Sequence, residues 1–455
     1  MKKIIPFKFI VFGFAFACIL AGCAHQNNAP TQATKSSDQV VKKEEGLSRL
    51  STTKNRIVDE SGNPYIIKGI STHGLGWFPE ILNQNSFDHF KNDFKLNTVR
   101  LALYTAENGG YCTDGNKKQL EQTLEKGIKL CQENEMYCVI DWHILSDQNP
   151  LDHLSESKEF FEKIAKQYGS SPNIIFEICN EPNGNTTWQD VCDYANQIIP
   201  IIRKYSNNLI LVGTPNWSQD IDQAAQAPLD YENIAYTLHF YAATHKEDLR
   251  AKYKAVVDQI PIVVSEFGIC DASGNGTIDE ESANAWIRLL DQYDTGRILW
   301  NASNKEEASS ILKPGTDMAN WTLDDLSASG KWLLLQNKEH NQDQKQEEKA
   351  DKTNDPVTVL KVNEWEKDEK QETQISIQIT ASQDLSTWTV DLEFDQPVQI
   401  TDHWNCNAQA SKNQIQLTSM DYNANLKKDQ TLKDIGLIVK TNRKIDSSQI
   451  KAHLK

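Results

Sequence analysis

The feature that most constrains the fold is a regular alternation of short apolar runs and longer amphipathic stretches between about residues 50 and 335. The amphipathic stretches repeat apolar residues every three or four positions, as at Leu120, Leu124 and Ile128, which predicts helices. Strands alternating with helices predict parallel βα units, and eight units in about 285 residues match a (β/α)8 TIM barrel. The eight predicted strands are Ile66–Ser71, Thr98–Tyr104, Tyr137–Ile144, Asn173–Asn180, Leu209–Thr214, Ile234–Tyr241, Pro261–Gly268 and Arg297–Ala302.

Polar side chains gather toward the C-terminal ends of these runs. A single such residue is usually a cap or a loop residue. In a barrel, however, the C-terminal strand ends converge on one mouth, where the chemistry of this fold takes place. Five strands that end this way therefore predict a site, and the residues concerned are Arg100, His143, Asn180 with Glu181, His239 with Tyr241, and Glu266.

Two of these residues, Glu181 and Glu266, have the chemistry that glycoside hydrolysis needs. A gap of about 5–5.5 Å between such carboxyls gives retention and about 6.5–9.5 Å gives inversion, and we expect the short gap. We expect Arg100 and Tyr241 to hydrogen-bond Glu266, which favours its charged, nucleophilic form. The nearby charge and partial burial should raise the pKa of Glu181, the acid/base. Asn180 is predicted to bind the sugar 2-hydroxyl.

Three tryptophans lie at or just beyond the C-terminal ends of predicted strands one, five and eight: Trp77, Trp217 and Trp300. An indole offers a flat apolar surface with one N–H donor, which suits the C–H faces of sugars. A tryptophan is also a common core residue, but at this end of a barrel these three are predicted to line a cleft.

The first residues predict export. Lys2 and Lys3 precede an apolar run, Phe9 to Leu20, that is too short to span a bilayer. The run ends in Leu20-Ala21-Gly22-Cys23, which resembles a bacterial lipobox, although a plain signal peptide is the alternative. We therefore predict a signal peptide over 1–22, lipidation of Cys23, a flexible tether over 23–49, and a membrane-anchored lipoprotein that faces the cell exterior.

Charge and motifs exclude several other classes of function. A net charge of −16 argues against nucleic-acid binding, which needs clustered Lys and Arg. The sequence has no metal-ligand spacing, phosphate loop or nucleotide fingerprint, so no metal or cofactor is expected. Of nine cysteines, seven lie beyond the signal and Cys23, and we expect most of them to be buried apolar residues, with one disulfide possible.

The pattern changes after the predicted catalytic domain, 50–335. Residues 336–355 are almost entirely polar or charged and predict a linker. Beyond it the apolar residues alternate, as at Ile375, Ile377 and Ile379. This period of two predicts a small β-sandwich over 356–455.

The barrel region resembles glycoside hydrolase family 5, in particular its bacterial endo-β-1,4-glucanases. The matching segments are Ser71-Thr72-His73-Gly74-Leu75-Gly76-Trp77, Asp141-Trp142-His143-Ile144-Leu145, Phe176-Glu177-Ile178-Cys179-Asn180-Glu181-Pro182-Asn183-Gly184, Leu238-His239-Phe240-Tyr241, Ser265-Glu266-Phe267-Gly268, Asp271-Ala272-Ser273-Gly274-Asn275-Gly276 and Leu326-Ser327-Ala328-Ser329-Gly330.

This resemblance implies a retaining β-glucan hydrolase with Glu181 as acid/base and Glu266 as nucleophile. It places the family's other active-site positions at Arg100, His143, Asn180, His239, Tyr241 and Trp300, and subsite positions at His73, Trp77, Lys305 and Glu307. The sequence departs from close relatives at Phe267, Pro215-Asn216-Trp217 and Phe78-Pro79-Glu80, which affects the expected subsites and not the reaction.

The C-terminal region resembles carbohydrate-binding module family 2. Trp365, Trp404 and Tyr422 fall on that family's surface aromatics and Trp388 falls on a core position. The family's Gly-Phe after the first Trp is replaced here by Glu366-Lys367-Asp368-Glu369.

The sequence pattern is compatible with several related functions. Mannanase, xyloglucanase, xylanase and mixed-linkage glucanase activities share the fold and differ in their loops. A lipoprotein that captures oligosaccharides without cleaving them is a further alternative, although such a protein should have lost one of the two carboxylates.

Overall fold

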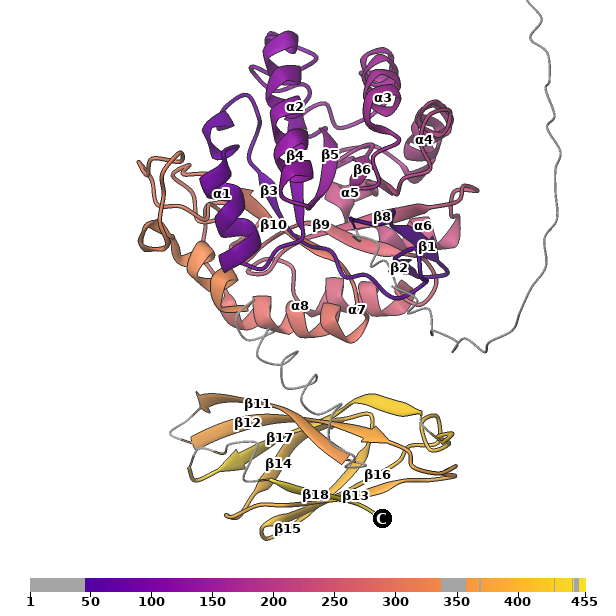
Figure 1. The fold of residues 1–455 in the computed structure, drawn as a ribbon, viewed down its shortest axis with the longest axis vertical. Coiled ribbons are helices and arrows are strands. Elements are labelled where there is room, and N and C mark those ends of the chain that lie inside the picture. The colour runs from indigo at the N-terminus through magenta and orange to yellow at the C-terminus, as the bar shows by residue number, and fades with distance from the viewer. Residues whose placement is uncertain (1–45, 337–356, 368–369, 429, 444, 446–449) are drawn as a thin grey trace, which may run out of the picture. The chain divides into compact units, whose positions relative to one another are not determined.

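A computed structural model describes residues 46–336, 357–367, 370–428, 430–443, 445 and 450–455 (Figure 1). The predicted signal peptide, Cys23 and nearly all of the predicted linker lie outside these ranges. In the part of the chain that the structure describes, no helix combines the length and the apolar character needed to cross a membrane.

The first large region is a closed barrel of eight parallel strands, in the order β10-β3-β4-β5-β6-β7-β8-β9. This confirms the predicted TIM barrel. The fourth predicted strand is shorter than expected, because it ends at Glu177, so that Asn180 and Glu181 lie in the following loop. The strands are β3 (Lys68–Thr72), β4 (Thr98–Tyr104), β5 (Tyr137–His143), β6 (Ile174–Glu177), β7 (Ile210–Val212), β8 (Ile234–Tyr241), β9 (Ile262–Gly268) and β10 (Arg297–Ala302).

Helices follow the strands and surround the barrel (Figure 1). Several begin at capping residues that the sequence supplies: Asn116 accepts from the Gln119 N–H, and Thr187 and Asp190 form a capping box. The labelled helices are α1 (Gln84–Asp88), α2 (Lys117–Glu133), α3 (Leu154–Tyr168), α4 (Trp188–Arg203), α5 (Pro215–Ser218), α6 (Ile221–Gln226), α7 (Glu247–Val256) and α8 (Glu280–Gln292), with the single turns η1 (Pro79–Ile81), η2 (His89–Asp93) and η3 (Leu323–Asp325), and a further helix spans 328–336.

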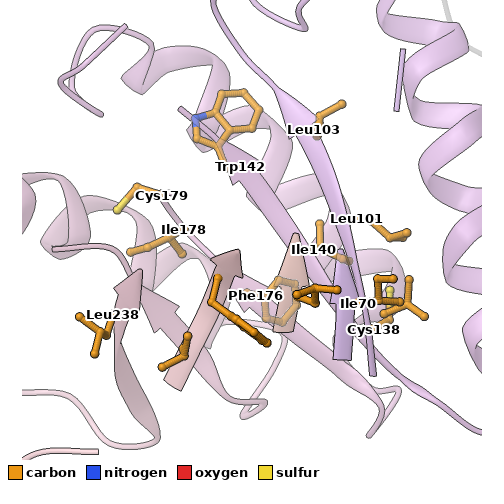
Figure 2. Packing of buried hydrophobic residues seen from close by; sticks show 14 of the residues in the cluster. Ile70, Leu101, Leu103, Cys138, Ile140, Trp142, Phe176, Ile178, Cys179 and Leu238 are labelled. Carbon is orange, nitrogen blue, oxygen red and sulfur yellow. The ribbon is translucent and has the colours of Figure 1, made fainter. Parts of the chain in front are cut away.

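Successive strand residues face opposite sides of the barrel wall. The outward side chains pack beneath the helices, and Figure 2 shows part of this layer, including Leu101, Ile140 and Phe176. Inside, the N-terminal halves of the strands are apolar, with Tyr137 and Val139 in one buried cluster. The inward positions nearer the C-terminal ends of the strands are polar. These polar side chains therefore gather inside the barrel at its C-terminal end.

A β-bulge interrupts this alternation in β9. In the pairing with β8, Thr237 lies opposite Val263 and His239 lies opposite Glu266. Over this stretch β9 therefore has one more residue than β8. The pairing with β10 shifts over the same stretch. A bulge re-aims side chains locally. As a result the consecutive residues Ser265 and Glu266 both contact residues inside the barrel.

A hairpin of β1 (Ser51–Thr53) and β2 (Arg56–Val58) precedes the barrel. Leu50, just before it, is buried in the same cluster as the apolar barrel interior, and Leu47 packs against that cluster. All seven cysteines in the described residues are free thiols, most of them buried, so the possible disulfide is not formed there.

The C-terminal region is all β, as predicted. Two four-stranded sheets, β11-β12-β17-β14 and β15-β16-β13-β18, contribute to one buried cluster. Trp388 is fully buried in it, as expected, and donates its indole N–H to Asn423 O at 3.0 Å. The strands are β11 (Val357–Lys367), β12 (Lys370–Thr380), β13 (Thr389–Glu393), β14 (Gln399–Trp404), β15 (Asn407–Ser411), β16 (Gln414–Thr418), β17 (Thr431–Thr441) and β18 (Lys451–Leu454).

Candidate active site

A pocket of about 600 Å³ opens at the C-terminal ends of the barrel strands. Its wall contains ten of the residues that the sequence singled out: His73, His143, Glu181, Trp217, His239, Tyr241, Glu266, Trp300, Lys305 and Glu307. Tyr104, Asn216, Gln219 and His245 also line it and were not predicted. Arg100 and Asn180 have no exposed surface and lie behind the pocket wall.

The two candidate catalytic carboxyls face each other in this pocket. One oxygen of Glu181, one oxygen of Glu266 and one ring nitrogen of His239 all lie within 4.8 Å of one another. Among the described residues this is the one His, Cys, Asp or Glu group close enough to hold a metal ion. Arg100, however, already places a positive charge 3.1 Å from Glu266. The spacing of the two carboxyls falls on the short side of the range for glycoside hydrolysis.

Each oxygen of Glu266 accepts one hydrogen bond, from the two donors that the sequence analysis predicted. Tyr241 Oη donates to Oε1 at 2.8 Å, and Arg100 Nη1 donates to Oε2 at 3.1 Å. These donors favour the carboxylate, but they do not outweigh burial. Burial, followed by the negative charge of Glu181, raises the pKa of Glu266 above its ordinary value.

Glu181 has a different environment. Its Oε1 lies 3.0 Å from His239 Nδ1. Burial raises the pKa of Glu181 to about 8; Arg100 opposes this shift, and the negative charges of Asp141 and Glu177 add to it. Glu181 therefore keeps a proton at neutral pH, as predicted for an acid. Glu266, in contrast, accepts two hydrogen bonds, and both favour its carboxylate form.

Arg100 on β4 connects two buried acids that sequence reasoning did not select. Its guanidinium lies 2.6 Å from Glu177 Oε2 and 3.0 Å from Asp141 Oδ2, and also donates to Asn180 Oδ1 at 2.7 Å. Asp141 in turn lies 2.6 Å from His143 Nδ1. Strand alternation could have found both acids, since they occupy inward positions of β5 and β6.

Asn180 is held by this network. Its amide also donates to Ile144 O at 3.0 Å, and its Nδ2 lies 3.3 Å from His143 Nε2. The contact between Asn180 and a sugar 2-hydroxyl thus remains a prediction.

One end of the pocket is aromatic and basic. Lys305 Nζ lies 2.6 Å from Glu307 Oε2 and 3.1 Å from His73 Nε2. The Trp300 ring stacks on His143 with centroids 5.2 Å apart. Trp77 is outside the pocket wall but packs on Tyr104, with centroids 4.6 Å apart.

Trp217 lies on the pocket wall in α5, which is a loop and not a regular α-helix, because Asn216 and Trp217 have left-handed dihedral angles. Asn216, Trp217 and Ser218 have φ of 57°, 56° and 55°, a conformation that costs energy for residues with a side chain. The loop is anchored by Ser218 Oγ, which donates to Asn180 O at 2.7 Å. Trp217 is 44% exposed, so its indole is available for contact with a ligand.

Comparison with known proteins agrees with this geometry. The family model described as Cellulase (glycosyl hydrolase family 5) matches residues 58–306, more than half of the chain. The chain belongs to glycosyl hydrolase family 5. A second model, Cellulose binding domain, matches residues 357–452, so this family 5 glycoside hydrolase also carries a module of that kind.

Named relatives of the family 5 chain include two endoglucanases. Endoglucanase A of Butyrivibrio fibrisolvens is 38% identical over 293 residues, which cover 63% of this chain and 68% of the relative. An endoglucanase of Clostridium saccharobutylicum is 41% identical over 288 residues, covering 62% and 63%. The chain thus spans slightly more than two thirds of the first relative and slightly less of the second.

Solved structures show the same similarity. Cellulase Cel5C_n has a TM-score of 0.62 at 35% identity, with 64% of this chain and 92% of that chain covered. A variant of the Thermobifida fusca endoglucanase Cel5A catalytic domain, in complex with cellotetraose, has a TM-score of 0.61 at 32% identity, with 64% and 97% covered.

Proposed function

We propose that this family 5 protein is a retaining endo-β-1,4-glucanase, with Glu266 as nucleophile and Glu181 as acid/base. The observation that carries the proposal is the approach of a Glu181 oxygen to within 4.8 Å of a Glu266 oxygen in one pocket. This spacing lets both carboxyls act on one anomeric centre and leaves too little room for an intervening water.

In the first step the Glu266 carboxylate attacks the anomeric carbon and the glycosidic C–O bond breaks. Glu181 gives its proton to the leaving oxygen, and the sugar remains as an ester of Glu266. Tyr241 and Arg100 hold Glu266 in its ionised, attacking position through the two hydrogen bonds described above. The raised pKa of Glu181, about 8, supplies the acid at neutral pH.

In the second step the ester no longer carries the charge of Glu266. Glu181, now a carboxylate, takes a proton from water while the water oxygen attacks the anomeric carbon. The ester bond breaks, Glu266 regains its carboxylate, and Glu181 is protonated again. The sugar keeps its original configuration because two inversions have taken place.

A β-1,4-glucan is the substrate class that the relatives support. Two named relatives are endoglucanases, and one similar solved structure holds cellotetraose. Mannan, xylan, xyloglucan and mixed-linkage glucan are the alternatives, and a panel of these polymers with carboxymethylcellulose discriminates among them. Fastest turnover of any polymer other than the β-1,4-glucan would contradict this assignment.

Product stereochemistry tests the mechanism. Proton NMR of a fresh digest of soluble β-glucan should show the β-anomer first, with mutarotation to the α-anomer later. Glu266→Gln should remove turnover and leave sugar binding in place. Initial α-anomer would show inversion, and tight oligosaccharide binding without turnover by the intact protein would support glycan capture instead.

We infer that the C-terminal module holds the enzyme on cellulose through aromatic side chains. A Cβ on Gly436 would lie 2.0 Å from the Trp404 ring, so the glycine makes room for this indole against β17. Trp404 is half-buried, and Tyr422 is 69% exposed and donates to Asn405 Oδ1 at 2.8 Å, next to Trp404. The side chain of Trp365 lies outside the described residues.

Depletion of the intact protein from solution by microcrystalline cellulose measures this binding. Trp404→Ala and Tyr422→Ala should each weaken it. Gln416→Ala is the matched control, because this exposed residue lies on β16 in the other sheet. Equal binding by all these variants and the parent would contradict a role for the two aromatics.

We also propose that the protein is exported and anchored in a membrane through a lipid on Cys23, on the cell exterior. The support is the sequence Leu20-Ala21-Gly22-Cys23 after a short apolar run. Labelled fatty acid fed to the producing cells should enter the parent and not Cys23→Ser. Equal labelling of both proteins would contradict the anchor.

A further inference from the structure

Ser265, the residue before the proposed nucleophile, connects two buried groups. Its Oγ lies 2.6 Å from Glu177 Oε1 and 2.9 Å from His239 Nε2. Ser265 and Glu177 are fully buried and His239 is 1% exposed. The bulge in β9 puts Ser265 in this position, since both Ser265 and Glu266 contact groups inside the barrel. These contacts determine which atoms of Glu177, Ser265 and His239 carry the hydrogens of the hydrogen bonds.

A serine hydroxyl has a single hydrogen to donate. Glu177 Oε2 is paired with Arg100 at 2.6 Å, so Glu177 is an acceptor-only carboxylate. Two oxygens 2.6 Å apart need a hydrogen between them, and only Ser265 can supply it. Toward His239 Nε2, the same hydroxyl must then accept, which requires a hydrogen on Nε2.

Nδ1, the other ring nitrogen of His239, is therefore unprotonated. Burial, the largest cause, lowers the pKa of His239 to about 4, so the ring is neutral at neutral pH and carries one hydrogen. With that hydrogen on Nε2, Nδ1 is an acceptor. Glu181 Oε1 lies 3.0 Å from Nδ1, and a hydrogen bond there needs the proton to be on Glu181.

We propose that Ser265 and Glu177 are positioning residues that fix the Nε2–H tautomer of His239 and so keep the acid proton on Glu181. The inference rests on the proposed function and deepens it. A bare Nδ1 stabilises the protonated form of Glu181 and offers no hydrogen bond to its anion. In the first step Glu181 is therefore kept as an acid, and in the second step its anion is a strong base toward water.

Other titratable groups surround this pair and bear on its protonation. Arg100 on β4, Asp141 and His143 on β5, Glu177 on β6 and Glu266 on β9 all contribute electrostatically to Glu181, His239 or Glu266. Burial raises the pKa of Asp141 to about 7, so this group also titrates near neutrality. Asp141 contacts Arg100 and His143, and a change at Ser265 leaves both contacts in place.

Two tyrosines complete the surroundings. Tyr104 on β4 and Tyr241 on β8 feel the charge of both Glu181 and Glu266, and burial raises the pKa of each well above its ordinary value. Both therefore stay protonated over the working range. Neither tyrosine therefore contributes its own titration to a shift of the pH profile in Ser265→Ala.

The tautomer can be read directly by nitrogen NMR of isotope-labelled histidine in the full chain. The protein has 10 histidines, and the signals absent from His239→Gln identify His239. The parent should carry hydrogen on Nε2. Ser265→Ala should populate the Nδ1–H form, and Ser265→Thr, which keeps the hydroxyl, should restore Nε2–H. An Nδ1–H form in the parent, or an unchanged tautomer in Ser265→Ala, overturns the proposal.

Kinetics give a second readout. In Ser265→Ala the Nδ1–H form can donate to the Glu181 anion, so the alkaline limb of kcat/KM should move down by about one pH unit. Ser265→Thr should return the limb to the parent position. A loss of rate without a shift would mean that Ser265 is only structural. The NMR test is independent of turnover, so failure of the proposed glucanase function is distinguishable from failure of this inference.

Discussion

The hydroxyl of Tyr241 offers a sharp test of how the proposed nucleophile, Glu266, is kept ionised. It donates to Glu266 Oε1 at 2.8 Å inside a buried pocket, and Tyr241→Phe removes that single oxygen. A hydrogen bond to a charged group contributes about 1.5–3 kcal/mol, and one pKa unit corresponds to about 1.4 kcal/mol. The pKa of Glu266 should therefore rise by about one to two units in the variant.

The sign of the effect follows from the mechanism. In the proposed mechanism Glu266 must be ionised to attack, so activity is present above its pKa and is lost as pH falls through it. The acid limb of kcat/KM on a soluble glucan should move to higher pH by about one to two units, with a loss of about 10- to 100-fold below the limb. Rates measured from about pH 4 to about pH 9 cover this change.

A matched variant separates this effect from the loss of a buried hydroxyl. Tyr236 lies on the same strand, β8, and its hydroxyl accepts from the Leu229 N–H at 2.8 Å, away from Glu266. Tyr236→Phe should leave both limbs in place. An unmoved acid limb in Tyr241→Phe, or equal shifts in the two variants, would refute the claim that Tyr241 controls the charge of Glu266.

Three further predictions concern the acid, the buried ion pairs and the module. The parent should lose activity as pH rises through about 8, where Glu181 loses its proton. In Glu181→Gln the rate on glucan should fall by about 10²- to 10⁴-fold. The rate of the first step on an aryl glycoside with a good leaving group should fall far less, because that leaving group needs no proton. Arg100→Met leaves three buried carboxylates without their cation and should lower the free energy of unfolding by about 3–5 kcal/mol in denaturant titration, less at acid pH; equal losses at both pH values would contradict this. Trp388→Ala should destabilise the module by about 3–5 kcal/mol in calorimetry while the barrel transition stays in place, and the half-buried Trp404→Ala is its control.

The barrel was predictable because its strands combine apolar runs with clear ends. The ranges Thr98–Tyr104, Ile234–Tyr241 and Arg297–Ala302 match the structure. The run Asn173–Asn180 was predicted too long, because Ile178 and Cys179 are apolar and buried although they lie beyond the ladder. Burial sets the hydrophobic pattern, whereas hydrogen-bond pairing sets the end of a strand, so the pattern alone could not place this boundary.

The candidate site was predictable only in part. The closed barrel brings Glu181 and Glu266 together, which follows from strand order and polar strand ends. The connections through Glu177 and Ser265 were missed, since their roles depend on which neighbouring side chain each atom meets. The bulge in β9 was also hidden, because it is a mismatch between two neighbouring registers and leaves no mark in the local sequence.

That bulge has a consequence for how this enzyme can be redesigned. It lets two adjacent residues, Ser265 and Glu266, both contact groups inside the barrel. A backbone shift that moves one of them therefore displaces the other. Trp77 and Trp217, in contrast, lie outside the barrel strands, so substituting either side chain leaves the β9 bulge untouched. A library that varies Trp77 and Trp217 and keeps 261–268 fixed should change which polymer is accepted while every active member still yields the same anomer.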